Sequence, residues 1–216
     1  MNRRHPLQQQ GQSLTEFLVA ILGFGVLLLA MLQAILLYRA KTTVDYAAME
    51  AARAGALHGA DKNQMQKGLA RGLTPLYATA TASPSIAGTA AAYAKAYPAV
   101  LAFSTIKVLS PTTASFDDFK EAQYDGTMAL PNDTLNFRPT NVGGRGGLSV
   151  QDANILKIAV TFKYPLIVPI IDAVIGKTDF ARSALEGHTV YSLEIASTAM
   201  VRMQSPITNR DNLAAP

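Results

Sequence analysis

The stretch that decides the fold lies at residues 17–37 and reads FLVAILGFGVLLLAMLQAILL, near the start of a 216-residue chain. Gln33 carries its only side chain that is not apolar. At about 1.5 Å per residue, a helix of this run is roughly 31 Å long, which is enough to cross the hydrocarbon core of a bilayer. We therefore expect a membrane-spanning helix here.

A secretory signal peptide is the alternative, because the basic residues Arg3 and Arg4 precede the run. The apolar core of a signal peptide is usually about 7–15 residues long and ends at a small-x-small cleavage site. The run at 17–37 is longer, and Tyr38 and Arg39 follow it instead of such a site. The pattern therefore favours a membrane anchor.

Glu16 directly precedes the apolar run. A carboxylate there is unusual, since burying it at the centre of a bilayer costs about 2.5–3.5 kcal/mol, although less near the interface. Such a residue usually has a partner.

Gly11, followed by Gln12-Ser13-Leu14-Thr15-Glu16-Phe17 and the apolar run, resembles the processing site of type IV pilins and their relatives. In that family a membrane prepilin peptidase cuts after the glycine, so the resemblance implies a cut between Gly11 and Gln12. Glu16 then becomes the fifth mature residue. The family carries a glutamate there, which pairs with the N-terminal amine of a neighbouring subunit or guides the subunit into the filament.

Small and apolar residues continue at helical spacing after the run, at Val44, Ala48, Ala51 and Gly55, so we expect the helix to reach about Leu57. The side chains of this Ala-rich continuation are small enough for a sheet or another helix to pack closely against them. The pattern Ala47-Ala48, then Ala51-Ala52-Arg53, behind an apolar anchor resembles the TadE-like minor pilins of the tight-adherence (Tad) pilus system.

Size and charge limit the classes of protein. The chain has room for one membrane segment and one modest globular domain. Its formal charge is +4, and loss of Arg3 and Arg4 with the leader would leave 17 of the 19 basic residues against 15 acidic ones. This balance gives no case for nucleic-acid binding. The absence of cysteine excludes disulfides and fits either cytoplasm or periplasm.

The remaining segments show mixed helix and strand patterns. Asp61 could cap a second helix that ends near Pro75. Residues 78–98 read as a loop with one helical turn at 90–95, and residues 112–147 as a long loop rich in turn residues. We expect strands at 100–109, 156–164 and 189–203. In the last of these, Tyr191, Leu193, Ile195, Val201 and Met203 should share one face, and Ser192, Glu194, Thr198 and Arg202 the other.

These patterns predict an α+β fold. The resemblance to pilins implies that a long N-terminal transmembrane and amphipathic helix packs on a small antiparallel sheet. We expect a prepilin leader at 1–11, a hydrophobic transmembrane helix at 12–37, an amphipathic continuation with a second helix at 38–77, and a periplasmic β-rich pilin-like domain at 78–216.

No constellation marks a catalytic, cofactor or metal site. His5, His58 and His188 are scattered without partners at metal-ligand spacing. We expect Glu186 and His188 to point in different directions. The glycines at 143–147 lack the Gly-Lys-Ser/Thr ending of a phosphate loop, and no serine lies in a nucleophile motif. We therefore expect no enzyme and no cofactor.

The apolar stretch PLIVPIIDAVIG at 165–176 is too short and too broken to span a bilayer. It is either core beneath the sheet or an exposed patch that docks on the membrane or on a partner pilin. The patch candidates are Leu166, Ile167, Val168, Ile170 and Ile171.

The resemblance implies a minor pilin or pseudopilin of a bacterial Tad-type pilus, acting in assembly, initiation or tip formation for adherence. Its partners would be the prepilin peptidase, other minor pilins, the Tad assembly platform and the inner membrane, with no nucleic acid. It would cross the inner membrane once, N-terminus in the cytoplasm and C-terminal domain in the periplasm, and could enter the extracellular pilus. The alternatives are a pseudopilin of a secretion system, or a signal-anchored periplasmic enzyme or ligand-binding domain whose site is shaped by 112–147.

Overall fold

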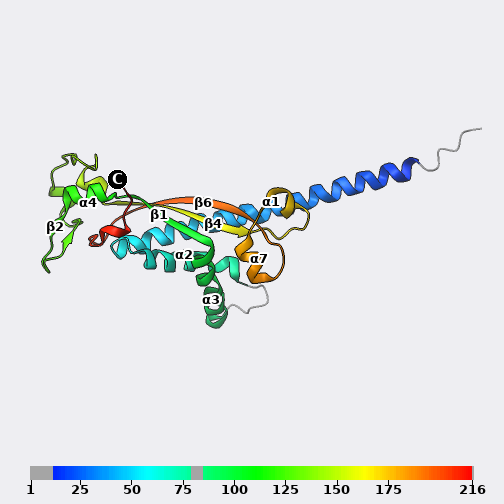
Figure 1. Cartoon of the computed structure of the whole chain (residues 1–216), viewed down its shortest axis with the longest axis horizontal. Coiled ribbons are helices and arrows are strands. Elements are labelled where there is room, and N and C mark those ends of the chain that lie inside the picture. The colour runs from blue at the N-terminus through cyan, green and yellow to red at the C-terminus, as the bar shows by residue number, and fades with distance from the viewer. Residues whose placement is uncertain (1–11, 79–84, 216) are drawn as a thin grey trace, which may run out of the picture. The chain divides into compact units, whose positions relative to one another are not determined.

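The computed structural model describes residues 12–78 and 85–215. They form an α+β fold with a long N-terminal helix and a four-stranded antiparallel sheet, as the sequence predicts (Figure 1). The chain divides into two compact units. The first combines the chain up to Tyr38 with Pro165–Leu193, and the second combines Arg39–Tyr164 with the chain from Glu194 onward.

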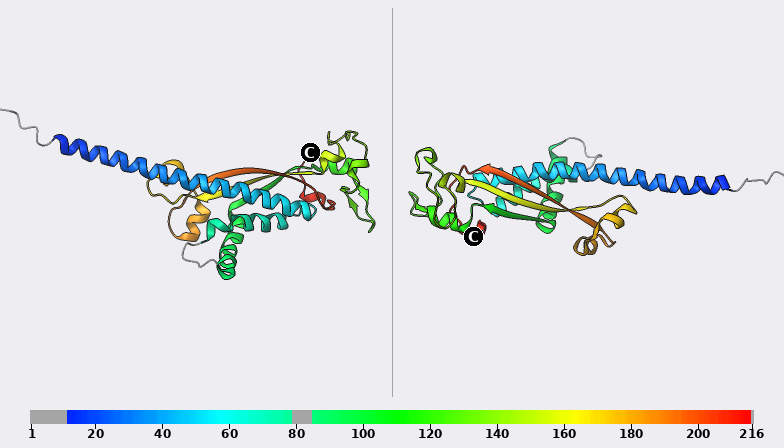
Figure 2. Two further views of the ribbon diagram at one scale, coloured as in Figure 1. Left: turned by 180° about the vertical axis from the view of Figure 1, so that it is seen from behind. Right: turned by 90° about the horizontal axis from the view of Figure 1, so that it is seen from above.

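The long helix α1, Gln12–Leu57, continues without a break from the apolar run into the Ala-rich segment and ends where the pattern predicts. In the second unit it lies beside α2, Lys62–Tyr77 (Figure 2). Asp61 caps α2 as expected, because its carboxylate accepts from the backbone N–H of Asn63 at 2.7 Å. Pro75 lies inside this helix rather than after it.

Small side chains hold α1 and α2 close together. Ala47 and Ala51 of α1 are fully buried. A Cβ atom added to Gly72 would lie only 2.7 Å from the Cβ atom of Ala47, and one added to Gly68 would lie 3.0 Å from the Cα atom of Ala51. The alanine motif therefore serves a close helix–helix contact, one of the two packing partners expected for it. Arg53 stays outside this contact.

The sheet has the strand order β1-β4-β6-β5. Its strands are β1, Ser104–Ser110; β4, Ile155–Pro165; β5, Lys177–Thr178; and β6, Tyr191–Arg202. β1 runs antiparallel to β4, with Ser104 opposite Phe162, and β5 runs antiparallel to the start of β6. The alternation predicted for 156–164 is confirmed, since its buried residues are Leu156, Ile158, Val160, Phe162 and Tyr164.

The prediction for β6 holds over most of its length. Ile195 and Met203 are buried and Val201 is half-buried, whereas Glu194 and Arg202 are exposed. At the start of the strand the predicted faces are wrong, because Ser192 is buried while Tyr191 and Leu193 are only half-buried. Tyr191 and Ser192 are the residues that pair with the short strand β5, so neighbours specific to this end of the strand set their burial.

The prediction of a loop at 78–98 and a strand from residue 100 is wrong in part. The structure has an 18-residue helix, α3, Ile86–Phe103, and β1 begins only at Ser104. Pro98 lies inside α3 although proline disfavours helix interiors. Alanine has the highest helix propensity, and buried positions such as Ala96 and Val100 add tertiary packing that outweighs the local penalty.

The region predicted as a long loop at 112–147 contains short elements of its own. They are α4, Thr113–Phe119; β2, Glu121–Ala122; β3, Met128–Ala129; and the 3-10 helix η1, Leu135–Phe137. The other short helices are α5, Val150–Ala153; α6, Ile171–Ile175; α7, Phe180–Glu186; and the 3-10 helix η2, Arg210–Asn212. Of these, α6 and α7 belong to the first unit.

Candidate functional site

The predicted processing site lies at the edge of the described residues. Gly11 lies outside them, and Gln12 is the first residue of α1. Glu16 follows in the second turn of the helix, and its side chain is exposed. The cut after Gly11 and the pairing of Glu16 with the amine of another subunit stay predictions.

The first part of α1 presents an almost continuous apolar surface. It is the one helix within 12–78 and 85–215 that is long and apolar enough to cross a membrane. Large apolar side chains are exposed along it: Phe17, Leu18, Val19, Ile21, Leu22, Phe24, Val26, Leu27, Leu28, Met31, Leu32 and Ile35. A surface of this kind marks contact with a membrane or with another protein.

Gln33 is the exception within the apolar run at 17–37, because it is fully buried. Its Oε1 atom accepts hydrogen bonds from the backbone N–H groups of Val168 at 3.0 Å and Ile167 at 3.4 Å, and all three residues belong to the first unit. The sequence marks Gln33 only as the single polar residue in the apolar run. No sequence pattern predicts its hydrogen-bond partners, one of which, Val168, lies 135 positions further along the chain.

The apolar stretch at 165–176 divides between the two roles considered for it. Leu166, Val168 and Ile171 are buried, as the core interpretation expects. Ile167 and Ile170 are 66% and 59% exposed, as a docking patch would require. The stretch begins at Pro165, the last residue of β4, and contains α6. The N–H group of Leu166 donates to the carbonyl oxygen of Tyr191 at 2.9 Å.

Glu16 and this stretch are not brought together. Glu16 lies 17 residues before Gln33 on one continuous helix, which corresponds to about 26 Å along its axis. The candidate residues therefore form two separate features of the first unit, one at the N-terminal end of α1 and one around Gln33.

The glycine-rich turn at 143–147 surrounds a carboxylate of the protein itself. Asp118 Oδ2 accepts from the backbone N–H groups of Arg145 at 2.9 Å and Gly146 at 2.7 Å. A side chain at Gly143 would collide with Asp118, and one at Gly146 would collide with Ser115. These backbone donors therefore bind an internal anion, and the glycines are needed for the close approach of the chain.

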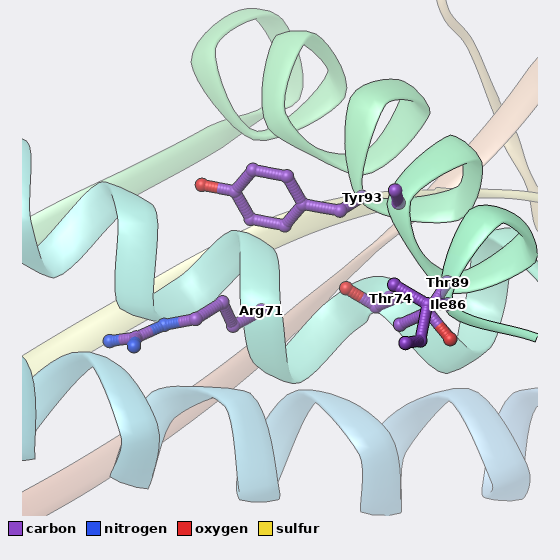
Figure 3. Close-up of a pocket in the computed structure, with 6 residues that line it drawn as sticks. Arg71, Thr74, Ile86, Thr89 and Tyr93 are labelled. Atoms are coloured by element: carbon purple, nitrogen blue, oxygen red, sulfur yellow. The ribbon is translucent and has the colours of Figure 1, made fainter.

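An apolar groove of about 580 Å³ lies between α2 and α3 (Figure 3). Arg71 and Thr74 of α2 and Ile86, Thr89, Ala90 and Tyr93 of α3 line it. In Figure 3 the Arg71 guanidinium and the Tyr93 hydroxyl extend in the same direction. The residues that line the groove include no carboxylate and no histidine. The groove has no pair of groups suited to acid–base chemistry.

The expectation that Glu186 and His188 diverge is wrong. Glu186 ends α7, and Gly187 follows with a φ of 73°, which turns the chain so that His188 Nε2 lies 3.5 Å from Glu186 Oε2. Both side chains are exposed. Within the described ranges, no group of three His, Cys, Asp or Glu residues could hold a metal ion.

Comparison of the chain with family models, with curated proteins and with solved structures gives no match. The likeness to TadE-like minor pilins therefore remains a resemblance of sequence, carried mainly by the residues at 11–17 and 47–53.

Proposed function

We propose that this protein is a minor pilin or pseudopilin of a bacterial Tad-type pilus that acts in pilus assembly, initiation or tip formation. The observation that carries the proposal is the uninterrupted helix α1. Its exposed apolar side chains at 17–37 directly follow Glu16, and Gly11 and Gln12 lie just before Glu16 in the sequence. A subunit of this kind is cut by a prepilin peptidase, waits in the inner membrane and then moves laterally into a filament.

The burial pattern along α1 supports different roles for the two parts of the helix. Its Ala-rich part is buried against α2, so Ala47 and Ala51 are not accessible to another protein. The part at 17–37 is exposed and apolar, and it is therefore the part that lipid, or the same helix of another subunit, can cover. The proposed role is binding and assembly rather than catalysis.

The proposal includes a topology. The N-terminus lies in the cytoplasm, the helix crosses the inner membrane at 17–37, and the domain that follows lies in the periplasm, from which it can enter the pilus. Its partners are the prepilin peptidase, other minor pilins and the assembly platform of the pilus.

The N-terminus of the protein tests this function directly. The full chain is expressed with and without a prepilin peptidase, and its N-terminus is determined by mass spectrometry. We expect a chain that begins at Gln12 only when the peptidase is present, and loss of this product in a Gly11→Leu variant. An intact Met1 in both samples would contradict the proposal and leave an ordinary signal anchor.

A further inference from the structure

The loop that follows β4 is tied to the apolar part of α1. Gln33 Oε1 accepts from the N–H groups of Ile167 and Val168, and the Gln33 side chain is completely buried by this contact region. A backbone donor without an acceptor is costly in an apolar environment, so the two hydrogen bonds keep this part of the loop on the helix.

The position of Gln33 on α1 sets the position of the loop along the helix axis. Gln33 lies four residues before Leu37, which ends the apolar run, so it is about 6 Å inside that end along the axis. The inference that follows depends on the proposed function in one respect, namely that 17–37 crosses the membrane. The backbone of Ile167 and Val168 then lies at the depth of the outer part of the bilayer.

The chemistry of the loop suits this depth. Four of its large apolar side chains are exposed: Ile167, Ile170, Val174 and Ile175. Asp172 is its single charged residue, and the Asp172 carboxylate accepts from the N–H group of Ala173 at 2.8 Å. The N–H groups of Leu166, Asp172 and Gly176 donate to backbone carbonyl oxygens. A segment with apolar side chains and paired backbone groups can enter the boundary between headgroups and acyl chains.

We propose that residues 166–175 form a second membrane contact, in which Ile167 and Ile170 insert into the lipid of the periplasmic leaflet beside α1. Lipid is the occupant that the structure favours, because Gln33 places these side chains level with the exposed apolar surface of the same helix. The contact would hold the first unit at the membrane surface until the subunit leaves for the filament.

Site-specific labels test this inference, since the chain has no cysteine of its own. Single cysteines replace Ile167, Ile170, Leu28 or Val142 in the full chain, which is reconstituted into phosphatidylcholine–phosphatidylglycerol vesicles and labelled with an environment-sensitive fluorophore. Val142 is the matched control, because it is as exposed as Ile167, 66% for each, but belongs to the second unit. Brominated lipids then quench the labels that touch acyl chains.

We expect quenching at positions 28, 167 and 170, at least threefold stronger than at position 142. Quenching at position 28 with none at 167 and 170 would overturn the second contact while the anchor stands. Absence of quenching at all four positions would remove the membrane anchor itself. Labels at 167 and 170 that escape quenching, together with disulfide formation between two copies of the unlabelled cysteine variants under an added oxidant, would overturn the assignment in favour of a subunit interface.

Discussion

Gln33 shows how one side chain can join an apolar helix to an irregular segment. The N–H groups of Ile167 and Val168 lie between the end of β4 and the start of α6, outside the regular backbone hydrogen bonding of either element. Gln33 Oε1 supplies it at 3.0 Å for Val168 and 3.4 Å for Ile167. The amide oxygen therefore satisfies two backbone donors of the loop.

Replacing Gln33 with leucine should release this loop. The variant keeps the apolar character of the helix but removes the acceptor, and a buried donor left without a partner costs about 1–3 kcal/mol. We expect hydrogen exchange at the Val168 amide to become faster by about tenfold or more, since about 1.4 kcal/mol corresponds to a factor of ten. Hydrogen-exchange mass spectrometry of the full chain in detergent measures this change.

The matched control is Gln66→Leu, which makes the same chemical change on α2 in the second unit. It should leave exchange at residues 165–176 unchanged. Equal protection of Val168 in Gln33→Leu and in the unmodified protein would contradict the role given to the amide.

Asp117 gives a second prediction at this scale. A hydrogen bond from Arg210 at 2.9 Å, and a weaker one from Lys120, hold the pKa of Asp117 below its ordinary value of 3.8. A carboxylate with a lowered pKa in the folded state stabilises the fold above its unfolded-state pKa, and this contribution is lost as the pH falls through the folded-state pKa. The link between α4 and η2 should therefore persist at pH 4 and weaken only under more acidic conditions.

Carbon-13 NMR of the Asp117 carboxyl group measures this titration. In Arg210→Gln the midpoint should move up toward 3.8, because the principal hydrogen bond to the ionised form is lost. Arg202→Gln serves as the control, since it also removes a positive charge and Arg202 is not among the groups that lower this pKa. Identical midpoints in Arg210→Gln and the unmodified protein would show that Arg210 does not set the pKa.

Among the elements, those whose pattern repeats along the chain could be predicted and those fixed by distant partners could not. Strand β4 was predictable because Ile158, Val160 and Phe162 alternate with outward residues, and this alternation is the direct consequence of one buried face. Helix α3 was missed because residues 78–98 read as a loop, while burial of Ala96 supplies tertiary packing that sustains the helix through Pro98. The same reason hides the loop partner of Gln33.

The contact between α1 and α2 should not tolerate a methyl group at Gly72. A Cβ atom at Gly72 would lie 2.7 Å from the Cβ atom of Ala47 and closer still to the Ala47 backbone, so the helices must separate. Overpacking of this kind costs about 1–3 kcal/mol, even though alanine favours a helix over glycine by about 1 kcal/mol. We expect Gly72→Ala to lower the melting temperature of the full chain in detergent.

Gly25→Ala is the control for this experiment. Gly25 also lies inside a helix, but apart from the neighbouring backbone of that helix no atom lies within 4 Å of the position that its Cβ atom would take. This variant should be neutral or slightly more stable because only the helix propensity changes. A melting temperature in Gly72→Ala that equals or exceeds that of Gly25→Ala would show that the helices adjust without cost.

The two units of the chain meet different requirements of the proposed filament subunit. The second unit closes a core of its own, which includes the Ala-rich part of α1 and the buried faces of β4 and β6. The first unit keeps a large apolar surface on α1 exposed. The proposed passage from membrane to filament therefore changes what covers the first unit, and it does not require the core of the second unit to open.

Glu16 should decide whether the subunit makes this passage. It begins the apolar part of α1, where the proposed partner is the N-terminal amine of a neighbouring subunit, and loss of one member of an ion pair in low dielectric costs about 3–5 kcal/mol. We expect Glu16→Gln to reduce the number of pili, counted by electron microscopy, more than about tenfold, while processing after Gly11 and membrane insertion continue. Glu50→Gln removes a carboxylate that pairs with Arg53 at 3.0 Å within the same helix, so it should leave pilus number unchanged. Normal pili in Glu16→Gln would show that the carboxylate has no part in assembly, whereas equal loss in both variants would point to a general effect of removing charge from α1.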